Sequence, residues 1–457
     1  MTETSSPDPV VVVGGGVSGL AAAVGLTARG IPTILLEQKP TLGGRAYSFT
    51  DATTGDTVDN GQHVLIAGYE HTRALLQTVG AIDLLSIQKY PALLFHHPTH
   101  GFDSLRLPPL PSPLHLAWGL LGFRLLSRAD RWKLLGAGLS IYRTGQVKNR
   151  VPAEWTIAQW LDDLGQSPES QRSFWEPMAI AIMNEHIAQA SAQVFVHTLR
   201  SAFLSGWHSA ALAIPRVGLS ALYVEPSRQF IAGHGGTIRC GTDVVGLETS
   251  GLSVRGVRLR TDSAVPCSAA ILAVPPNRLG ELLPGVLRED PAFAALESIS
   301  PSPIISIYLW FDQDFMEDEF VGLIGRSIQW VFNRRKIARI KGNGGHLVAV
   351  ISAAYDVVSY SNEELTRLVV DDLRSVYPGC PTTPRHALVI REKRATFPST
   401  PRSEPFRPSQ RTPLHNLFLA GDWTSTGFPA TIEGAVVSAE RCVELAVDCI
   451  STQKSRY

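Results

Sequence analysis

The sequence predicts an α/β protein in which a parallel sheet is assembled from segments at both ends of the chain. Residues 10–13 are a β-branched run that enters a glycine-rich turn, residues 18–29 have helical composition, and residues 34–37 form the next strand. This order is typical of a parallel strand pair with a crossover helix. Near the other end, an apolar strand at 417–420 precedes a helix predicted over 431–447. Both ends therefore carry a strand, a turn and a helix.

The middle of the chain predicts a helical region and two groups of strands. Residues 114–204 are rich in Leu, Ala and Trp and are expected to be mostly helical. Residues 237–247 and 254–260 are expected to form a hairpin, followed by a buried strand at 269–274. A separate mixed sheet is expected to contain the strands 304–311, 327–332 and 346–352. Proline-rich loops are expected at 91–113 and 398–413.

The composition excludes some classes of function. Among 457 residues, 41 are Lys or Arg and 41 are Asp or Glu, so no net positive field attracts nucleic acid. Hydrophobic residues make up 44% and charged residues 18%, which favours a large apolar interior or an apolar substrate. The five cysteines are scattered and form no C-x-x-C pair, which is typical of reduced thiols in the cytoplasm.

The sequence shows no export signal and no membrane span. Residues 1–16 have no basic segment before the apolar run and no cleavage-type site. The longest apolar stretch, 113–126, is interrupted by Arg124 and is shorter than the ~18 residues that a span needs. We therefore expect a cytoplasmic protein, and attachment to the surface of a membrane is still open.

The first glycine-rich turn indicates a dinucleotide site. Gly14, Gly16 and Gly19 have the spacing G-x-G-x-x-G between a strand and a helix, with Ser18 in the first helical turn. Such a turn lets a diphosphate lie on the N-terminus of the helix. Glu37, at the end of the next strand, stands 18 residues beyond Gly19, where an acid accepts hydrogen bonds from ribose hydroxyls. A purely structural turn explains the glycines but not the acid.

The next motif favours FAD over NAD. Gly43, Gly44 and Arg45 resemble part of the R-x-G-G-R extension of the flavin amine oxidase and phytoene desaturase superfamily, although the first Arg of that pattern is absent. Arg45 is expected to reach the diphosphate while the two glycines let the backbone pass close to it. A surface turn with an arginine is the structural alternative.

The C-terminal part completes the resemblance. Gly421 and Asp422 follow the strand at 417–420 and resemble the superfamily's C-terminal flavin motif, in which Asp422 would bond the ribityl or phosphate edge. Thr431 and Ile432 would present a helix N-terminus, which favours negative charge, to the flavin ring. By the same resemblance, the backbone of residues 244–245, Val244 and Val245, would contact the adenine.

Four further segments resemble one subfamily, the hydroxysqualene dehydroxylases. They are 59–66, 190–195, 215–220, and 421–424 together with 429–435, and the likeness extends over essentially the whole chain. It implies bound FAD, an apolar polyprenoid substrate, and the reduction of hydroxysqualene to squalene. The alternatives are a carotenoid or phytoene desaturase, in which hydride moves in the opposite direction, and a non-enzymatic prenyl-binding chaperone. The intact glycine motif and Asp422 count against the chaperone.

These motifs predict a discontinuous, GR2-like Rossmann-type FAD-binding domain and a substrate-binding domain with a mixed sheet and helices. The FAD-binding domain is expected to contain residues 8–90, 216–276 and 414–450, and the substrate-binding domain residues 91–215 and 277–413. No motif identifies the electron donor that regenerates reduced FAD.

Two residues are candidates for catalysis. The turn of Gly61 and Gln62, both expected at the cofactor, should bring His63 near the flavin, although a lone histidine is often structural. Arg216 follows Pro215 in a loop expected to face the flavin, where a structural ion pair is an equal alternative.

Other polar residues are predicted to be structural. Residues 184–186, Asn-Glu-His, interrupt an apolar helical region, and a solvated helix end is favoured over a cavity wall. His96, His97 and His100 have no Cys or carboxylate to complete a metal site, so no metal is expected.

The segment 114–142 has two possible roles. Apolar residues such as Trp118 and Leu121 alternate with basic ones such as Arg128 and Lys133, a mixture suited to helices at a membrane surface. The alternative is that these helices only cover an apolar cavity.

Overall fold

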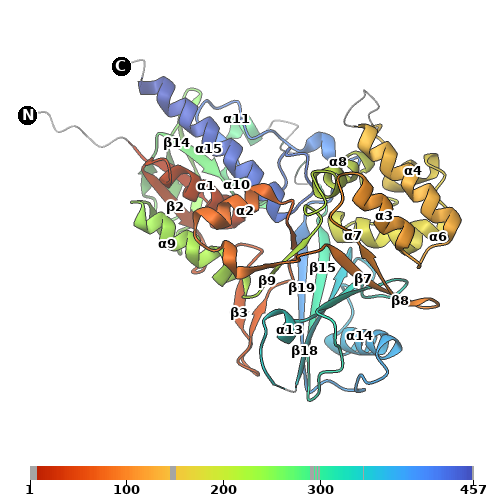
Figure 1. The fold of residues 1–457 in the computed structure, drawn as a ribbon. Coiled ribbons are helices and arrows are strands. Elements are labelled where there is room, and N and C mark those ends of the chain that lie inside the picture. The colour runs from red at the N-terminus through yellow and green to blue at the C-terminus, as the bar shows by residue number, and fades with distance from the viewer. Residues whose placement is uncertain are drawn as a thin grey trace, which may run out of the picture.

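The computed structural model describes residues 8–144, 151–288, 293, 296, 299–342 and 344–454. The predicted α/β class is confirmed: one parallel sheet, a larger mixed sheet and a layer of helices (Figure 1). Residues 1–7, which contribute to the expectation about export, lie outside the described residues. Among the described residues, no helix is both long and apolar enough to cross a membrane.

A five-stranded parallel sheet contains strands from four distant parts of the chain. Its order is β10-β2-β1-β14-β20. The bounds are Thr237–Cys240, Thr33–Glu37, Val10–Val13, Ala269–Leu272 and Leu417–Leu419. All residues of β1 and β14 are buried, which agrees with their continuous apolar runs and with a central place in a parallel sheet.

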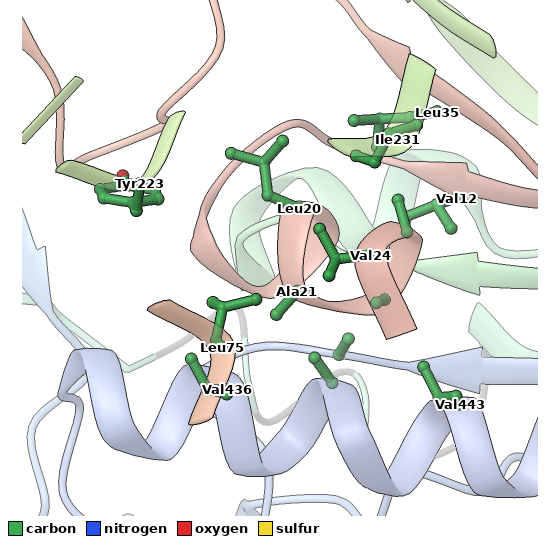
Figure 2. Close-up of a cluster of buried hydrophobic side chains, with 14 of the residues drawn as sticks. Val12, Leu20, Ala21, Val24, Leu35, Leu75, Tyr223, Ile231, Val436 and Val443 are labelled. Carbon is green, nitrogen blue, oxygen red and sulfur yellow. The ribbon is translucent and has the colours of Figure 1, made fainter. Parts of the chain in front are cut away.

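Helices α1 (Val17–Thr27) and α15 (Ile432–Lys454) pack together beside this sheet. Figure 2 shows Ala21 and Val24 of α1 facing Val436 and Val443 of α15. A Cβ added at Gly25 would lie 3.1 Å from Val443 Cγ2, so α1 has little room for a larger side chain there. The first and last helices of the chain therefore share one core.

The predicted strand at 237–247 is two strands. β10 ends at Cys240, Gly241 has φ +66°, and β11 (Val244–Ser250) then pairs with β12 (Ser253–Leu259). β10 joins the parallel sheet instead, while β13 (Ala264–Pro266) completes a three-stranded sheet with the hairpin. The prediction was wrong because strand composition alone does not show a left-handed glycine that turns the chain.

The predicted mixed sheet forms a second body, with seven strands where the sequence predicted three. Its order is β19-β15-β18-β17-β16-β7-β8, with bounds His386–Thr396, Ser302–Phe311, Gly345–Ser352, Trp330–Asn333, Phe320–Leu323, Ala92–His97 and Gly101–Arg106. The hairpin β7–β8 corrects the expectation of a loop over 91–113. The prolines there lie outside the paired residues, so they limit the strands without preventing them.

The predicted helical region is confirmed for most of the described residues between 114 and 204. It contains α3 to α8 with one π-helix: Leu114–Gly122, Arg128–Thr144, Ile157–Asp163, Pro168–Ser170, Gln171–Trp175 (π), Glu176–Met183 and Ala192–Phe203. These helices surround a buried cluster that includes Trp160, Trp175 and Phe195.

Smaller elements connect these bodies. They are β3 (Ser48–Thr50), β4 (Thr57–Asp59), β5 (Leu65–Ile66), α2 (Glu70–Thr78), η1 (Ile82–Leu84), β6 (Leu85–Ile87), β9 (Leu212–Pro215), η3 (Ser220–Val224), α9 (Glu225–Gly233), α10 (Pro276–Leu282), α11 (Gly285–Arg288), α13 (Arg334–Ile337), α14 (Asn362–Val376) and η4 (Glu404–Phe406).

Candidate active site

A cavity of about 880 Å³ lies at the carboxyl edge of the parallel sheet. Each strand of that sheet contributes a residue at or just beyond its end: Gly14 (β1), Glu37 (β2), Thr242 (β10), Ala273 (β14) and Ala420 (β20). Because the strands are parallel, their carboxyl ends meet at one edge, where open α/β sheets bind ligands.

Most of the residues predicted to bind the cofactor line this cavity. They are Gly14, Gly16, Ser18, Glu37, Gly43, Gly44, Arg45, Gly61, Gln62, His63, Val244, Gly421, Asp422, Thr431 and Ile432. Three other predicted site residues, Gly19, Val245 and Arg216, are not part of its lining. The individual roles of all of them remain predictions.

The two N-terminal glycine turns fit a diphosphate. The Gly43 N–H donates to Gly15 O at 2.8 Å, and a Cβ at Gly44 would lie 3.0 Å from Gly16 Cα, so the two turns are in contact. No side chain caps the N-terminus of α1 at Gly16, and its first turn contains no acid. Unpaired N–H groups at a helix start favour an anion.

Gly19 has a different function from its neighbours. A Cβ at this position would lie 1.8 Å from Gly14 O, so any larger residue would push α1 away from the turn. Gly19 therefore allows α1 to pack closely against the turn, although it does not line the cavity.

Glu37 supports the first turn and also faces the cavity. Its Oε2 accepts the Gly15 N–H at 2.6 Å, and its Oε1 accepts the Lys39 N–H at 2.9 Å. The side chain is buried. Each carboxylate oxygen has a second lone pair for a ribose hydroxyl, so this structural contact is compatible with the predicted role.

An ion pair joins the two ends of the chain at the cavity. Arg45 Nη2 donates to Asp422 Oδ1 at 2.6 Å, and Arg45 Nη1 donates to Ala395 O at 2.8 Å. The carboxylate of Asp422 raises the pKa of Arg45, against the opposing effect of burial. The prediction that both charged groups contact the cofactor is not tested by this geometry. The structure shows that they form an ion pair with each other.

The C-terminal motif is shaped by close packing. A Cβ at Gly421 would lie 2.3 Å from Trp423 Nε1, and that indole donates to Val274 O at 3.0 Å. Thr431 Oγ1 accepts the Gly434 N–H at 3.1 Å, so it caps the start of α15 at the cavity wall.

Glu433, in the same motif, is directed away from the cavity. Its carboxylate accepts the N–H groups of His71 and Thr72 and the Thr72 hydroxyl. Burial raises the pKa of Glu433, and these hydrogen bonds lower it in part. Glu433 therefore caps α2 instead of contacting the cavity.

The two residues predicted to contact the adenine, Val244 and Val245, differ in their position relative to the cavity. Val244 is buried and lines the cavity, whereas Val245 lies where the β11–β12 register shifts between Val244 and Gly246. The irregularity begins directly after Val244, and Val245 is not part of the cavity lining.

His63 has one engaged ring nitrogen and one free nitrogen. Its Nδ1 lies 2.7 Å from Gly61 O, which makes Nδ1 the protonated nitrogen and leaves Nε2 without a partner among the described residues. Burial lowers the pKa of His63 from its usual 6.5, and the hydrogen bond to Gly61 O and the charge of Asp59 oppose this only in part. His63 is therefore neutral near pH 7.

Two residues hold the turn that carries His63. Gln62 Nε2 donates to His63 O at 3.0 Å, and Gln62 Oε1 accepts from Arg334 Nη1 at 3.0 Å. Arg334 is buried although it lies 272 positions away in the sequence. Sequence reasoning missed Arg334, because an arginine in the basic run at 334–336 gives no sign of burial.

Arg216 does not contact the cavity, which corrects the expectation of a substrate contact. Its guanidinium donates to Asp83 O and its N–H donates to Leu84 O at 3.0 Å. These bonds join β9 to the end of η1. Arg216 therefore has a structural role, as the alternative hypothesis held, but its partners are backbone carbonyls and not the acid of an ion pair.

The expected solvated helix end at 184–186 is also wrong in part. Asn184 and Glu185 are buried, and Asn184 lines the cavity in the left-handed conformation that ends α7. The Asn184 amide donates to Thr396 Oγ1 at 2.8 Å and its Oδ1 accepts the Ala353 N–H at 2.7 Å. Asn184 thus joins α7 to the mixed sheet.

Away from the glycine turns, most of the cavity wall is apolar, although Asn184, Thr198, Ser352, Glu392, Arg394 and Thr396 also line it. The apolar residues come from the helical layer, the mixed sheet and the segment 210–212: Leu93, Met178, Ala181, Ile182, Ala202, Phe203, Ala210, Leu212, Ile304, Trp330, Phe332 and Val350. One cavity therefore has a polar end at the glycine turns and an apolar end between α7, α8 and the mixed sheet.

The histidines at 96–100 show no metal-ligand geometry. Within the described ranges, no group of three or more His, Cys, Asp or Glu side chains is placed to hold a metal ion. His96 and His97 lie in β7, and His97 stacks on His100 across the turn.

A family model for flavin-containing amine oxidoreductases matches residues 17–447. The chain belongs to this family. The glycine turns, the uncapped start of α1 and the Gly421–Asp422 turn fit FAD, and the protein is an FAD-dependent oxidoreductase. The residues named above along the polar end would hold the cofactor.

The chain also resembles individual proteins over nearly its whole length. It is 28% identical to a hydroxysqualene dehydroxylase of Sinorhizobium fredii, covering 98% of this chain and 100% of that protein. It is 25% identical to a 15-cis-phytoene desaturase of an Oncidium hybrid, covering 96% and 78%. An oxidoreductase from Methanosarcina mazei has the same fold, with TM-score 0.74 and 17% identity over 95% and 100% of the two chains.

Replacing Asp422 with Ala should weaken FAD binding. A charge-assisted hydrogen bond contributes roughly 1.5–3 kcal/mol, so Kd should rise about ten- to hundredfold. Titration of the apoprotein with FAD, followed by flavin fluorescence, measures this. Asp448→Ala, which removes an exposed acid from α15, is the control and should leave Kd unchanged. An unaltered Kd for Asp422→Ala would show that this carboxylate does not hold the cofactor.

Proposed function

We propose that the protein reduces hydroxysqualene to squalene. The observation that carries this proposal is the cavity itself, in which an apolar chamber continues directly from the FAD-binding turns. A C30 polyprenoid with one hydroxyl suits a chamber of this kind. The similarity to hydroxysqualene dehydroxylases over nearly the whole chain supports the same substrate.

The division of the chain predicted from the sequence remains part of this proposal. The FAD-binding part would comprise residues 8–90, 216–276 and 414–450, and the substrate-binding part residues 91–215 and 277–413. The residues at 145–150 and most of those at 289–298 lie outside the described residues.

Removal of an allylic hydroxyl requires a proton for the departing oxygen and a hydride for the carbon. Reduced FAD, when bound, supplies the hydride. We expect the apolar wall around Ile182, Phe203 and Trp330 to limit the access of water, so that a carbocation is not recaptured as an alcohol. The overall balance is one alcohol, one proton and one hydride giving one hydrocarbon and one water.

His63 is the chain's best candidate to exchange that proton. Its Nε2 is free, and its Nδ1 is oriented by Gly61 O, so the ring is held at the cavity wall. The carboxylates at the polar end are less suited, because Asp422 is paired with Arg45 and Glu37 bonds the first turn.

The pH dependence should reveal whether His63 acts as acid or base. Its folded-state pKa lies below 6.5, so an acid role predicts a rate that falls as pH rises through that lowered pKa. A rate that rises over the same interval would assign a base and would favour the desaturase direction. His63→Ala should reduce turnover roughly 10²-fold or more with FAD retained. His100→Ala, in an exposed turn, is the control; equal turnover in both variants would exclude His63.

A phytoene-type desaturase is the second candidate, and the similarity to the Oncidium enzyme supports it. The two reactions use one scaffold with opposite directions of hydride transfer, so the fold does not separate them. The chaperone hypothesis is not retained, because the chain belongs to an enzyme family and its FAD-binding turns are intact.

The direct test is the product formed without oxygen. Dithionite-reduced protein should convert hydroxysqualene to squalene with one equivalent of reduced FAD per alcohol. In heavy water, one non-exchangeable deuterium should appear at the carbon that carried the hydroxyl, as mass spectrometry of the squalene would show. Squalene without this label would refute direct hydride transfer. Conversion of phytoene with no action on hydroxysqualene would establish the desaturase.

We further propose that α3 and α4 contact a membrane surface. Leu120 of α3, and Phe123, Leu125 and Leu126 of the loop before α4, are buried and pack in the helical core, as expected if this segment covers a cavity. Other apolar side chains of the same two helices are exposed: Leu114 58%, Trp118 68%, Leu121 42%, Trp132 67% and Leu139 43%. Their spacings, 114, 118 and 121 on α3 and 132 and 139 on α4, place each set on one helix face.

The position of these helices supports access for an insoluble substrate. His115 of α3 is hydrogen-bonded through Nε2 to Phe203 O at 3.0 Å, and Phe203 lines the apolar end of the cavity. Arg131 of α4 donates to Leu121 O at 2.9 Å and joins the two helices. They lie at the end of the molecule opposite the two termini (Figure 1).

Flotation with vesicles of phosphatidylcholine and phosphatidylglycerol tests this surface. The protein should float with the vesicles, and Trp118→Gln with Trp132→Gln should shift it to the bottom fraction because interfacial tryptophans are lost. Leu252→Gln is the control, because Leu252 is an apolar residue between β11 and β12 that is 55% exposed. Unaltered protein that stays wholly at the bottom would contradict the proposal.

A further inference from the structure

Residues 398–413, which we call the strap, have no regular structure except for η4. This segment packs against the C-terminal FAD motif. It begins against the helical layer, where the Ser191 N–H, at the N-cap of α8, donates to Ser399 O at 2.8 Å. It ends where the Leu419 N–H of β20 donates to Gln410 O at 2.9 Å. The sequence predicted a polar loop here, yet Arg407 and Gln410 are buried.

The strap contacts the segment 421–431, the cofactor loop, through one backbone hydrogen bond and two side chains. The Ser425 N–H donates to Pro408 O at 2.8 Å. Near the start of the loop, Gln410 Nε2 donates to Thr424 Oγ1 at 2.9 Å. Thr424 Oγ1 lies 2.7 Å from Ser438 Oγ, which accepts the Gly421 N–H at 3.0 Å. This buried network fixes the residue before Asp422.

Arg407 makes the second side-chain contact, and its side chain is only 1% exposed. Its Nη2 donates to Asp422 O at 2.9 Å, and its Nη1 donates to Phe428 O at 2.8 Å. Nη1 also lies 3.2 Å from Glu404 Oε1, which neutralises the buried charge. A single guanidinium therefore spans the cofactor loop from Asp422 to Phe428.

Such an arrangement has a specific consequence for Asp422. A buried guanidinium requires acceptors on both of its terminal nitrogens, and here backbone carbonyls of the loop provide them. The backbone carbonyl of Asp422 accepts a hydrogen bond from Arg407, and its side-chain carboxylate is paired with Arg45 at the cavity. The main chain of Asp422 therefore cannot shift without breaking a charge-assisted hydrogen bond.

We propose that Arg407 is a positioning residue for FAD, which sets the cofactor loop so that Asp422 and the start of α15 face the cofactor. The inference rests on the proposed cofactor role of Asp422. Arg407 does not line the cavity, so it acts through the loop and not by direct contact.

Two variants test this positioning role. Arg407→Lys keeps the charge beside Glu404 but has one nitrogen for two separated carbonyls. The double variant Glu404→Gln/Arg407→Met removes both charges, so neither is left buried and unpaired. Both should raise the Kd for FAD roughly ten- to hundredfold, since each loses charge-assisted hydrogen bonds to the loop. They should also reduce the increase in melting temperature that saturating FAD gives the apoprotein.

Arg441→Gln is the matched control. Arg441 donates to Ser425 O at 2.9 Å and to Thr426 O at 3.3 Å from the exposed face of α15, so it contacts the same loop without burial. This variant should bind FAD as the unaltered protein does.

The outcomes separate the possible errors. If apo and holo melting temperatures fall equally and Kd is unchanged, Arg407 is only structural and the inference is overturned. If Arg407→Lys binds FAD normally, a positive charge at position 407 is sufficient for FAD binding. The inference that the two terminal nitrogens position the loop would then be wrong. If Asp422→Ala, measured beside them, leaves Kd unchanged, the proposed role of Asp422 fails independently of Arg407.

Discussion

The parallel direction of five strands is the constraint on which the rest of the structure depends. Chain segments that begin at residues 10, 33, 237, 269 and 417 enter one sheet in the same direction, so all of them leave at one edge. The glycine turns after β1 and β2 and the Gly421–Asp422 turn after β20 are formed there. The ion pair between Arg45 and Asp422 then joins the second and the last of these turns across 377 positions of sequence. Without the common strand direction, the two halves of the FAD site would lie at opposite edges.

Several residues in the motifs serve the backbone as much as the cavity. Glu37 bonds the Gly15 N–H, Gly19 allows α1 to approach the turn, and Glu433 caps α2. Glu37 and Glu433 share one physical reason: turns and helix starts have unpaired backbone N–H groups, and burial makes such groups costly unless a side chain bonds them. Gly19 acts through its small size alone. A motif is therefore a mixture of residues that face the ligand and residues that hold the turn in place.

The local parts of the fold could be predicted from the sequence, and the long-range parts could not. The first strand, helix and strand were predictable because β-branched and Ala-rich runs surround a glycine turn. The break after β10 was not, since it depends on the φ of Gly241. Asn184, Arg334 and Arg407 look like surface residues in the sequence, yet each is buried by a partner more than a dozen positions away. Their burial depends on tertiary contacts, which no local pattern contains.

The contrast between the two ends of the cavity follows from the same architecture. Turns at the sheet edge expose N–H groups and charged side chains, so that end suits the diphosphate and ribose of FAD. The other end is formed by helix faces and by a second sheet, whose side chains at the cavity are largely apolar because these elements bury one face against each other. A flavin ring held between the two ends would meet its substrate beside this largely apolar wall. His63, with one nitrogen fixed by Gly61 and the other free, lies on the wall of this cavity. At a largely apolar wall solvent competes less with such a proton-exchanging group, so its influence on the reaction is expected to be large.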